Sequence, residues 1–289
     1  MTDLICAHWT FAGIRNPLSL RDRARAAAEG GITRMGLALD DYRAARAEGL
    51  TPSELRRTVD EFGVRVEEIE FLRGWASTGD GPGLPGELVG ALPWTEQERI
   101  LLEMAETFEA DHLNCGDAGF NGPLLPLEEV VDRFGGLCSR AAAVGLTVVL
   151  EPMPWTPIPD LATARDIVAG AGTANGGILL DTWHYFRAGG NAAVLETLDP
   201  GLIKLIQVDD SGPAQGDVFE DTMTRRLFPG DGEFDLVGLF TRLKALGVQA
   251  PVSVEVMSDV IETLTPAEAV ARARTSTEAL LDKVNWGQA

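Results

Sequence analysis

The chain has 289 residues, of which 45% are hydrophobic, and this is enough for a large buried core. Its 24 basic and 44 acidic residues give a net charge of −20, which repels polyanions and argues against a nucleic-acid partner. Three scattered cysteines, Cys6, Cys115 and Cys138, exclude a disulfide framework and a CxxC zinc site. The sequence has no signal-peptide pattern and no run of roughly eighteen apolar residues. We therefore expect a cytoplasmic protein that does not bind a membrane.

Short β-rich segments recur along the chain. The predicted strands are residues 4–9, 34–39, 64–72, 111–115, 147–151, 177–181, 203–208 and 252–256. The fifth and sixth, "TVVLE" and "GILLD", are almost continuously apolar, which is typical of parallel strands covered on both faces. No glycine-rich phosphate fingerprint follows the first strand, and this argues against a Rossmann fold.

Helix boundary signals lie between these strands. In residues 51–63, Thr51 is the expected N-cap, Pro52 takes the first helical position and Glu54 completes a capping box. The other helices with such signals are predicted for residues 95–108 (capping box Thr95 and Glu98), 235–247 (from Asp235 to Gly247) and 265–281 (capping box Thr265 and Glu268).

Strands and helices alternate through the whole chain, which is the pattern of a parallel α/β fold. Eight such units in 289 residues fit a single closed (β/α)8 TIM barrel over residues 1–289 better than an open sheet. Residues 73–93 are crowded with Gly and Pro, so we expect a long loop or lid after the third strand. A linker between two domains is the alternative for this stretch.

Each of the last four predicted strands carries a polar residue at its last or next-to-last position. These residues are Glu151, Asp181, Gln207 and Glu255. In a barrel the carboxyl ends of all strands face one mouth, so these side chains are expected to converge. Carboxylates held close together repel one another, and a divalent cation with oxygen ligands, Mn²⁺, Mg²⁺ or similar, would remove that repulsion. Each acid alone could instead be structural; Asp181, for example, could be a helix N-cap.

Five stretches carry a resemblance to a known family: "VVLEP", "LLDTWH", "IQVDD", "RRLFPGDGEFD" and "VSVEV". The sequence resembles the xylose isomerase-like TIM-barrel superfamily of sugar phosphate isomerases and epimerases, from about residue 4 to 280. The resemblance implies that Glu151, Asp181, Gln207 and Glu255 bind one divalent metal ion. It also implies that His184, in a D-x-x-H motif, and Arg226 contact substrate oxygens, with Arg225 as the second choice for the arginine.

The resemblance implies proton abstraction next to a carbonyl on a sugar, keto-polyol or related hydroxycarbonyl. Glu151 and Glu255 would be the catalytic pair, one removing a proton and the other delivering one. The metal would bind the substrate oxygens and stabilise the developing charge. Many family members have His where this chain has Gln207, and the amide makes a zinc-preferring site less favoured.

Residues near the ends of the early strands are expected to form the rest of the pocket. His8, Asn114 and Glu70 are the predicted substrate-binding residues there, with Trp9 beside them. Tryptophans in nearby loops are candidates to screen the mouth from water: Trp75, Trp155 and Trp183. Asp209 and Asp210, just beyond Gln207, are expected to lie in a solvated loop, and an extension of the site is the alternative.

Four functions compete. The first is an isomerase or epimerase; the second is a lyase of the inosose dehydratase type, which uses the same enediolate but expels a β-hydroxyl. An apurinic endonuclease is disfavoured because its zinc cluster needs several histidines and the chain has three, His8, His112 and His184. A catalytically dead binding barrel is disfavoured because Glu151 and Glu255 are both present. The expected partner is a small-molecule substrate, and the resemblance implies a homodimer or homotetramer.

Overall fold

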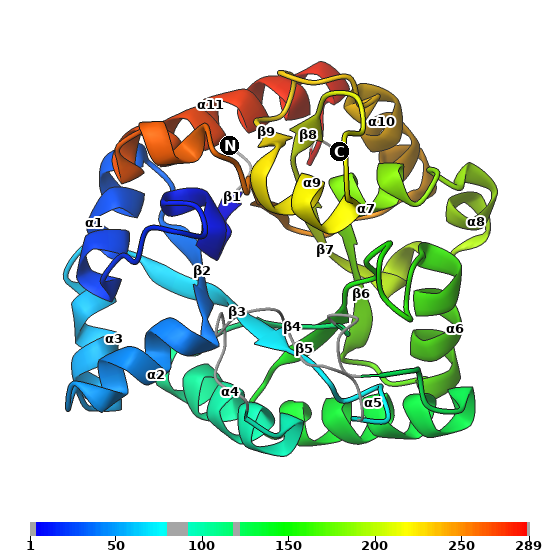
Figure 1. Ribbon diagram of the computed structural model, residues 1–289, viewed down its shortest axis with the longest axis horizontal. Coiled ribbons are helices and arrows are strands. Elements are labelled where there is room, and N and C mark those ends of the chain that lie inside the picture. Colours follow the sequence, from blue (N-terminus) through cyan, green and yellow to red (C-terminus); the bar gives the residue numbers. More distant parts are fainter. Residues whose placement is uncertain (1–3, 80–91, 118–121, 288–289) are drawn as a thin grey trace.

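Eight parallel strands close into a barrel in the order β1-β10-β7-β6-β5-β4-β3-β2, with the helices arranged around it (Figure 1). The structure is a computed structural model that describes residues 4–79, 92–117 and 122–287. The barrel strands are β1 (Leu4–Cys6), β2 (Arg34–Ala38), β3 (Arg65–Leu72), β4 (His112–Cys115), β5 (Thr147–Leu150), β6 (Gly176–Asp181), β7 (Ile203–Val208) and β10 (Val252–Val254). The predicted (β/α)8 TIM barrel and its eight strands are confirmed.

The helices cover the outside of the barrel or lie in the loops at its ends. They are α1 (Leu20–Gly30), α2 (Leu39–Ala47), α3 (Pro52–Asp60), α4 (Trp94–Phe108), α5 (Leu127–Ala142), α6 (Leu161–Ala171), α7 (Thr182–Arg187), α8 (Ala192–Thr197), α9 (Val218–Thr224), α10 (Leu236–Leu246) and α11 (Pro266–Val284), with 3-10 turns η1 (His8–Phe11), η2 (Pro200–Leu202) and η3 (Ile261–Thr263). Among the helices of the described residues, none has the combined length and apolar character needed to cross a bilayer.

The first strand is shorter than predicted. It ends at Cys6, and the chain then turns into η1. The side chain of Thr10 in this turn donates to the carbonyl of Val254 and accepts from the amide of Val256. These two hydrogen bonds replace the ladder that a longer strand would have made and tie the turn to the strand end of β10.

Three of the four predicted helix boundaries are confirmed. Capping boxes close the starts of α3 and α11, and α10 runs from its N-cap Asp235 to the left-handed Gly247. The predicted box of Thr95 and Glu98 is wrong, because α4 begins one residue earlier, at Trp94, and Thr95 lies inside its first turn. The carboxylate of Glu98 instead accepts from the guanidinium of Arg140 on α5.

The stretch predicted as a loop, residues 73–93, is only partly described. Residues 73–79 and 92–93 belong to no helix and no named strand. Ser77 makes an isolated antiparallel bridge with Leu124. Residues 80–91 lie outside the described residues, so the rest of the predicted loop stays a prediction.

The barrel interior is built in layers. Ile5, Val149, Leu179 and Leu205 form a small apolar cluster of their own, separate from the main core between strands and helices. Side chains two positions apart on a strand face the same side. Glu151, Asp181 and Gln207 each follow a member of this cluster by two positions, so they form the next interior layer toward the carboxyl ends. Strand periodicity thus places a polar layer directly on an apolar one.

The confirmed capping box at Thr265 and the rejected one at Thr95 can be compared by the same substitution. Thr265→Ala removes the hydroxyl that accepts from the Glu268 amide, and we expect it to lower the free energy of unfolding by about 1 kcal/mol. Thr95→Ala removes an exposed hydroxyl inside a helix and should change it by less than about 0.5 kcal/mol. Urea denaturation of the two variants measures both values, and equal losses would contradict the assignment.

Candidate active site at the carboxyl ends of the strands

The carboxyl ends of the strands surround a cavity of about 160 Å³. Its polar lining includes Glu70, Glu151, His184, Arg226 and Glu255. Much of the remaining lining is aromatic or otherwise apolar: Trp9, Phe71, Met153, Trp155, Phe219, Met223 and Met257. A ligand in this cavity would therefore meet charged groups and broad apolar surfaces together.

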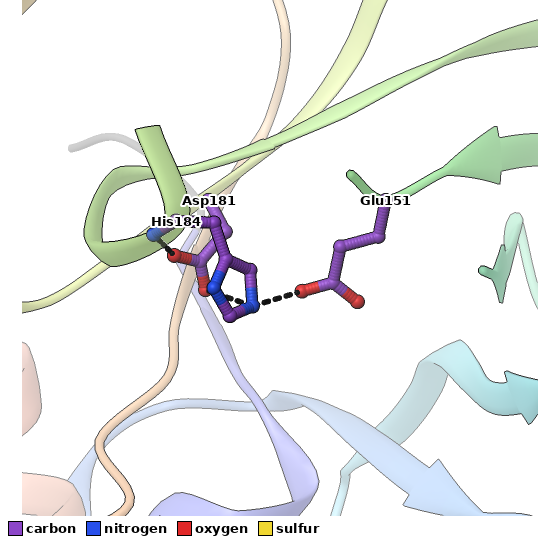
Figure 2. Close-up of side chains that lie close together, drawn as sticks. All are labelled: Glu151, Asp181 and His184. Carbon is purple, nitrogen blue, oxygen red and sulfur yellow. Dashed lines mark hydrogen bonds and ion pairs between the residues drawn. The ribbon is translucent and has the colours of Figure 1, made fainter. Parts of the chain in front are cut away.

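Glu151, Asp181 and His184 point toward one another (Figure 2). One ligand atom of each lies within 4.8 Å of the others, so the three could hold a metal ion. The Nε2 atom of His184 lies 3.1 Å from Glu151 Oε1 and 3.9 Å from Asp181 Oδ2. Asp181 also caps α7, because its Oδ1 accepts from the backbone amide of His184 at 2.8 Å. The capping role considered for Asp181 is thus present alongside its place in the cluster.

Arg226 is the cationic centre of the site. Its Nη1 donates to Asp181 Oδ2 at 2.7 Å, to Asp209 Oδ2 at 2.7 Å and to Glu255 Oε2 at 2.9 Å. The side chain is fully buried, and its Nε and Nη2 donate to Thr222. Two of the three carboxylates expected to gather around a metal, Asp181 and Glu255, therefore already meet at one guanidinium nitrogen. The third, Glu151, contacts His184 and Asn114 instead.

A short hairpin places Arg226 there. Strand β9 (Arg226–Leu227) pairs antiparallel with β8 (Asp210–Ser211), just beyond β7. Asp210 accepts from the backbone amides of Gly230 and Phe234 and so holds the "FPGDGEF" turn. A β-carbon at Gly232 would lie 2.6 Å from the backbone nitrogen of Ser211, so the close docking of this turn requires glycine.

Gln207 lies between Asp181 and Ser253 in the register of the barrel. Its Nε2 donates to Glu68 Oε1 at 2.8 Å and reaches Glu255 Oε1 at 3.4 Å. Its carbonyl oxygen is buried and has no hydrogen-bond partner among the described residues. A buried carbonyl left free in a cluster of carboxylates has the chemistry of a ligand for a hard cation.

Burial and mutual repulsion set the charge state of this end of the barrel. Burial, reinforced by the Glu68 and Glu151 charges, raises the pKa of Glu70 well above its ordinary value. Burial likewise raises the pKa of Glu68 to about 7 and that of Glu255 well above its usual range, although Arg226 lowers the latter. For Asp181, burial acts upward, but Arg226 and His184 outweigh it and hold the pKa below its usual value.

Of the predicted substrate-binding residues near the ends of the early strands, one lines the cavity and two contact other residues of the protein. Glu70 lines the cavity, and its Oε1 has no hydrogen-bond partner among the described residues. Asn114 donates to Glu151 Oε2 at 2.8 Å, so it orients a predicted catalytic acid. His8 is not among the described cavity-lining residues, and its Nδ1 accepts from the amide of Ala38. Substrate contacts of these three residues stay predictions.

The tryptophans take different positions. Trp9 and Trp155 line the cavity. Trp183 is fully buried and packs edge-on against His184 and Trp155, with the Arg226 guanidinium 5.6 Å from its ring centre. Trp75 is buried against Phe134 and is not among the described cavity-lining residues. Of the expected screening residues, Trp155 is thus the one that faces the cavity.

Two acids were misjudged and a third was missed. Asp209 and Asp210 were expected in a solvated loop, and this is wrong, because both are buried. Asp209 contacts Arg226 and accepts from the Thr182 hydroxyl at 2.6 Å. Glu68 was not singled out, although it stands two positions before Glu70 on the same strand; this spacing puts both on one face and could have identified it.

Comparisons with known proteins identify the family of the chain. The model of the family described as xylose isomerase-like TIM barrel matches residues 24–280, which confirms the resemblance found in the motifs. Inosose isomerase of Bacillus velezensis is 30% identical over 195 residues, 68% of this chain and 62% of that protein. 3-Dehydroshikimate dehydratase of Pseudomonas aeruginosa is 33% identical over 131 residues, 45% of this chain and 21% of that protein. The matches thus span less than two thirds of either relative.

Solved structures share the fold. A crystal structure of the IOLI protein, described as having a bound zinc atom, superimposes with a TM-score of 0.82 at 20% identity and covers 100% of both chains. A fusion of a xylose isomerase-like TIM barrel with 4-hydroxyphenylpyruvate dioxygenase gives 0.80 at 19% identity, over 98% of this chain and 43% of that one. At these identities the likeness establishes the fold alone.

The adjacent arginines provide a test of the site's electrostatics. Arg226→Met leaves Asp181, Asp209 and Glu255 without their shared cation, so we expect it to lower the free energy of unfolding by about 3–5 kcal/mol. Arg225→Met removes a partly exposed pair with Asp221, and solvent screens such pairs, so its free energy of unfolding should stay close to the wild-type value. Chemical denaturation in the presence of a chelator measures the difference. Similar losses in both variants would show that Arg226 is not the main compensating charge.

Proposed function

The chain belongs to the xylose isomerase-like TIM-barrel family, and on this premise we propose that it is a divalent-metal-dependent isomerase or epimerase. The reaction is a proton transfer at the carbon next to a carbonyl in a sugar, keto-polyol or related hydroxycarbonyl. The observation that carries the proposal is the arrangement of Glu151 and Glu255, which come from β5 and β10 strand ends and line one cavity with Arg226. Curated relatives of this family are enzymes named as an isomerase and a dehydratase.

The residues that would hold the metal are Glu151, Asp181, Gln207 and Glu255. The free buried carbonyl of Gln207 and the excess of carboxylates fit a hard cation such as Mn²⁺ or Mg²⁺. When bound, the cation would supply electrostatic stabilisation of negative charge on the substrate oxygens. His184 lies beside two of these ligands and is placed to orient the carboxylate of Glu151 or a substrate oxygen.

Two carboxyl groups in fixed orientations suit the exchange of a proton across a substrate. Asn114 donates to one oxygen of Glu151, and His184 faces the other. Arg226 donates to one oxygen of Glu255, and the Gln207 amide reaches the other. Strands β6 and β7 separate β5 from β10 around the barrel, so the two acids approach a bound substrate from different directions. One can remove a proton while the other returns it.

The cavity lining suggests the shape of the substrate. Aromatic side chains, among them Trp9, Phe71 and Trp155, share the cavity with carboxylates and a guanidinium. A polyhydroxylated ring ketone offers apolar ring faces to the first group and oxygens at its edge to the second. The inosose isomerase name of one relative fits this class of substrate.

A lyase is the second candidate. It is favoured by the 33% identity with the 3-dehydroshikimate dehydratase, which is the higher of the two identities although it covers a shorter stretch. In that reaction one carboxylate of the same pair would remove the proton next to the carbonyl, and the β-hydroxyl would take a proton from the other and leave as water. The two reactions differ in whether the product has lost water.

Deuterium exchange tests the proposal and separates the two candidates. In D2O with Mn²⁺, the protein should place deuterium at the carbon next to the carbonyl of an inosose without loss of water. A lyase would instead release water from its substrate, with 3-dehydroshikimate as the compound to try. Mass spectrometry of the product measures both. Absence of exchange and of water loss with a panel of ring hydroxyketones would contradict the proposal.

The two acids should be indispensable to this exchange. Glu151→Gln and Glu255→Gln each remove a proton-transfer group, so we expect the exchange rate to fall by about 100-fold or more. Glu128→Gln, at the exposed start of α5, should leave the rate unchanged. A chelator should abolish exchange, and added Mn²⁺ should restore it. If either the Glu151→Gln or the Glu255→Gln variant exchanged deuterium at the wild-type rate, that residue would not be a proton-transfer group.

A further inference from the structure

Among the predicted ligands, Gln207 is the one whose side chain can present either a donor or an acceptor to a cation. An amide has a donor end and an acceptor end of almost the same shape, and only the acceptor end can bind a cation. Here the donor end is occupied, by Glu68 Oε1 at 2.8 Å and by Glu255 Oε1 at 3.4 Å. The acceptor end is buried and without a hydrogen-bond partner among the described residues.

Glu68 reaches Gln207 across the barrel. It lies on β3, whereas Gln207 is on β7, on the other side of the barrel (Figure 1). The second oxygen of Glu68 accepts from the hydroxyl of Ser253 at 2.8 Å, and Ser253 is the register neighbour of Gln207 on β10. Both oxygens of this fully buried carboxylate are therefore engaged, and the side chain is fixed at two points.

A carboxylate that accepts two hydrogen bonds imposes a direction on the amide. When Glu68 is ionised, its Oε1 can only accept, so it pairs with the NH2 group of Gln207; the reverse amide orientation would bring two acceptors together. The orientation that satisfies Glu68 is also the one that leaves the carbonyl oxygen free.

We propose that Glu68, held by Ser253, is a positioning residue for the cation site and fixes the Gln207 amide with its carbonyl oxygen available as a ligand. The inference rests on the proposed function, because it concerns the same metal site. Outer groups that orient a ligand commonly change metal affinity by about 10–100-fold when they are removed.

Isothermal titration calorimetry of the metal-free 289-residue chain with Mn²⁺ measures the dissociation constant and tests this proposal. Glu68→Gln replaces an acceptor with an amide that can donate to the Gln207 carbonyl, so the dissociation constant should rise about 10-fold or more. Glu67→Gln is the matched control: it is the preceding residue of β3, is buried, and pairs with Arg34 rather than with the site. Its dissociation constant should stay within roughly twofold of the wild-type value.

A double-variant cycle separates positioning from the loss of a nearby charge. If Glu68 acts through Gln207, Glu68→Gln should change Mn²⁺ affinity by less than roughly twofold in a Gln207→Ala background. A persistent 10-fold loss in that background would overturn the inference in favour of a through-space charge effect. If Glu68→Gln does not fold by circular dichroism, Ser253→Ala keeps the Glu68 charge and should still weaken binding by about threefold or more.

The outcomes distinguish this inference from the proposed function. If the wild-type chain binds no divalent cation, the proposed function and the role of Glu68 both fail. If the wild-type chain binds Mn²⁺ and the folded Glu68→Gln variant binds it equally well, the metal site stands and the role of Glu68 is refuted. Both conclusions rest on the measured Mn²⁺ affinity and do not depend on enzyme activity.

Discussion

An excess of negative charge buried at one end of the barrel is the constraint on which the site depends. The acids there, Glu68, Glu70, Glu151, Asp181, Asp209 and Glu255, are all almost completely buried. Isolated carboxylates in such surroundings either acquire a proton or require a cation. Arg226 meets part of this requirement by binding three of them through one nitrogen. Raised pKa values at Glu255 and Asp209, caused mainly by burial, show that one guanidinium does not compensate the whole cluster.

Most of the fold was predictable because its signals are local and repeated. Several strands, such as β5 and β6, are short and largely apolar runs. The Thr-Pro-x-Glu sequences at Thr51 and Thr265 begin helices by hydrogen bonds within four residues. The prediction at Thr95 failed because a distant residue, not a local one, binds the side chain concerned. Glu98 could have closed a box there, but its carboxylate binds Arg140, which lies 42 residues away on the next helix. A sequence pattern does not reveal such competition between a local and a distant partner.

The candidate site was predictable in part for a similar reason. Strand-end positions follow from the barrel, so Glu151, Asp181, Gln207 and Glu255 could be grouped in advance, and the structure brings them into one connected network. The buried state of Asp209 could not be inferred, because it depends on a hairpin formed with residues from beyond α9. Neither could the link between Glu68 and Gln207, since it crosses the barrel between residues separated by 139 positions.

Gln207 on β7 illustrates how the chemistry of one proposed ligand changes what its neighbours must do. A metal-binding histidine fixes its ring through its second nitrogen, and its binding nitrogen must first lose a proton. An amide carries no such proton and offers a harder oxygen ligand, but it can also present the wrong end. A glutamine ligand therefore needs an acceptor opposite its NH2 group. In this barrel the Gln207 amide donates to Glu68, a buried carboxylate that also accepts from Ser253. When ionised, this carboxylate also adds negative charge near Glu151, so the group that we propose orients the ligand would increase the demand for a cation.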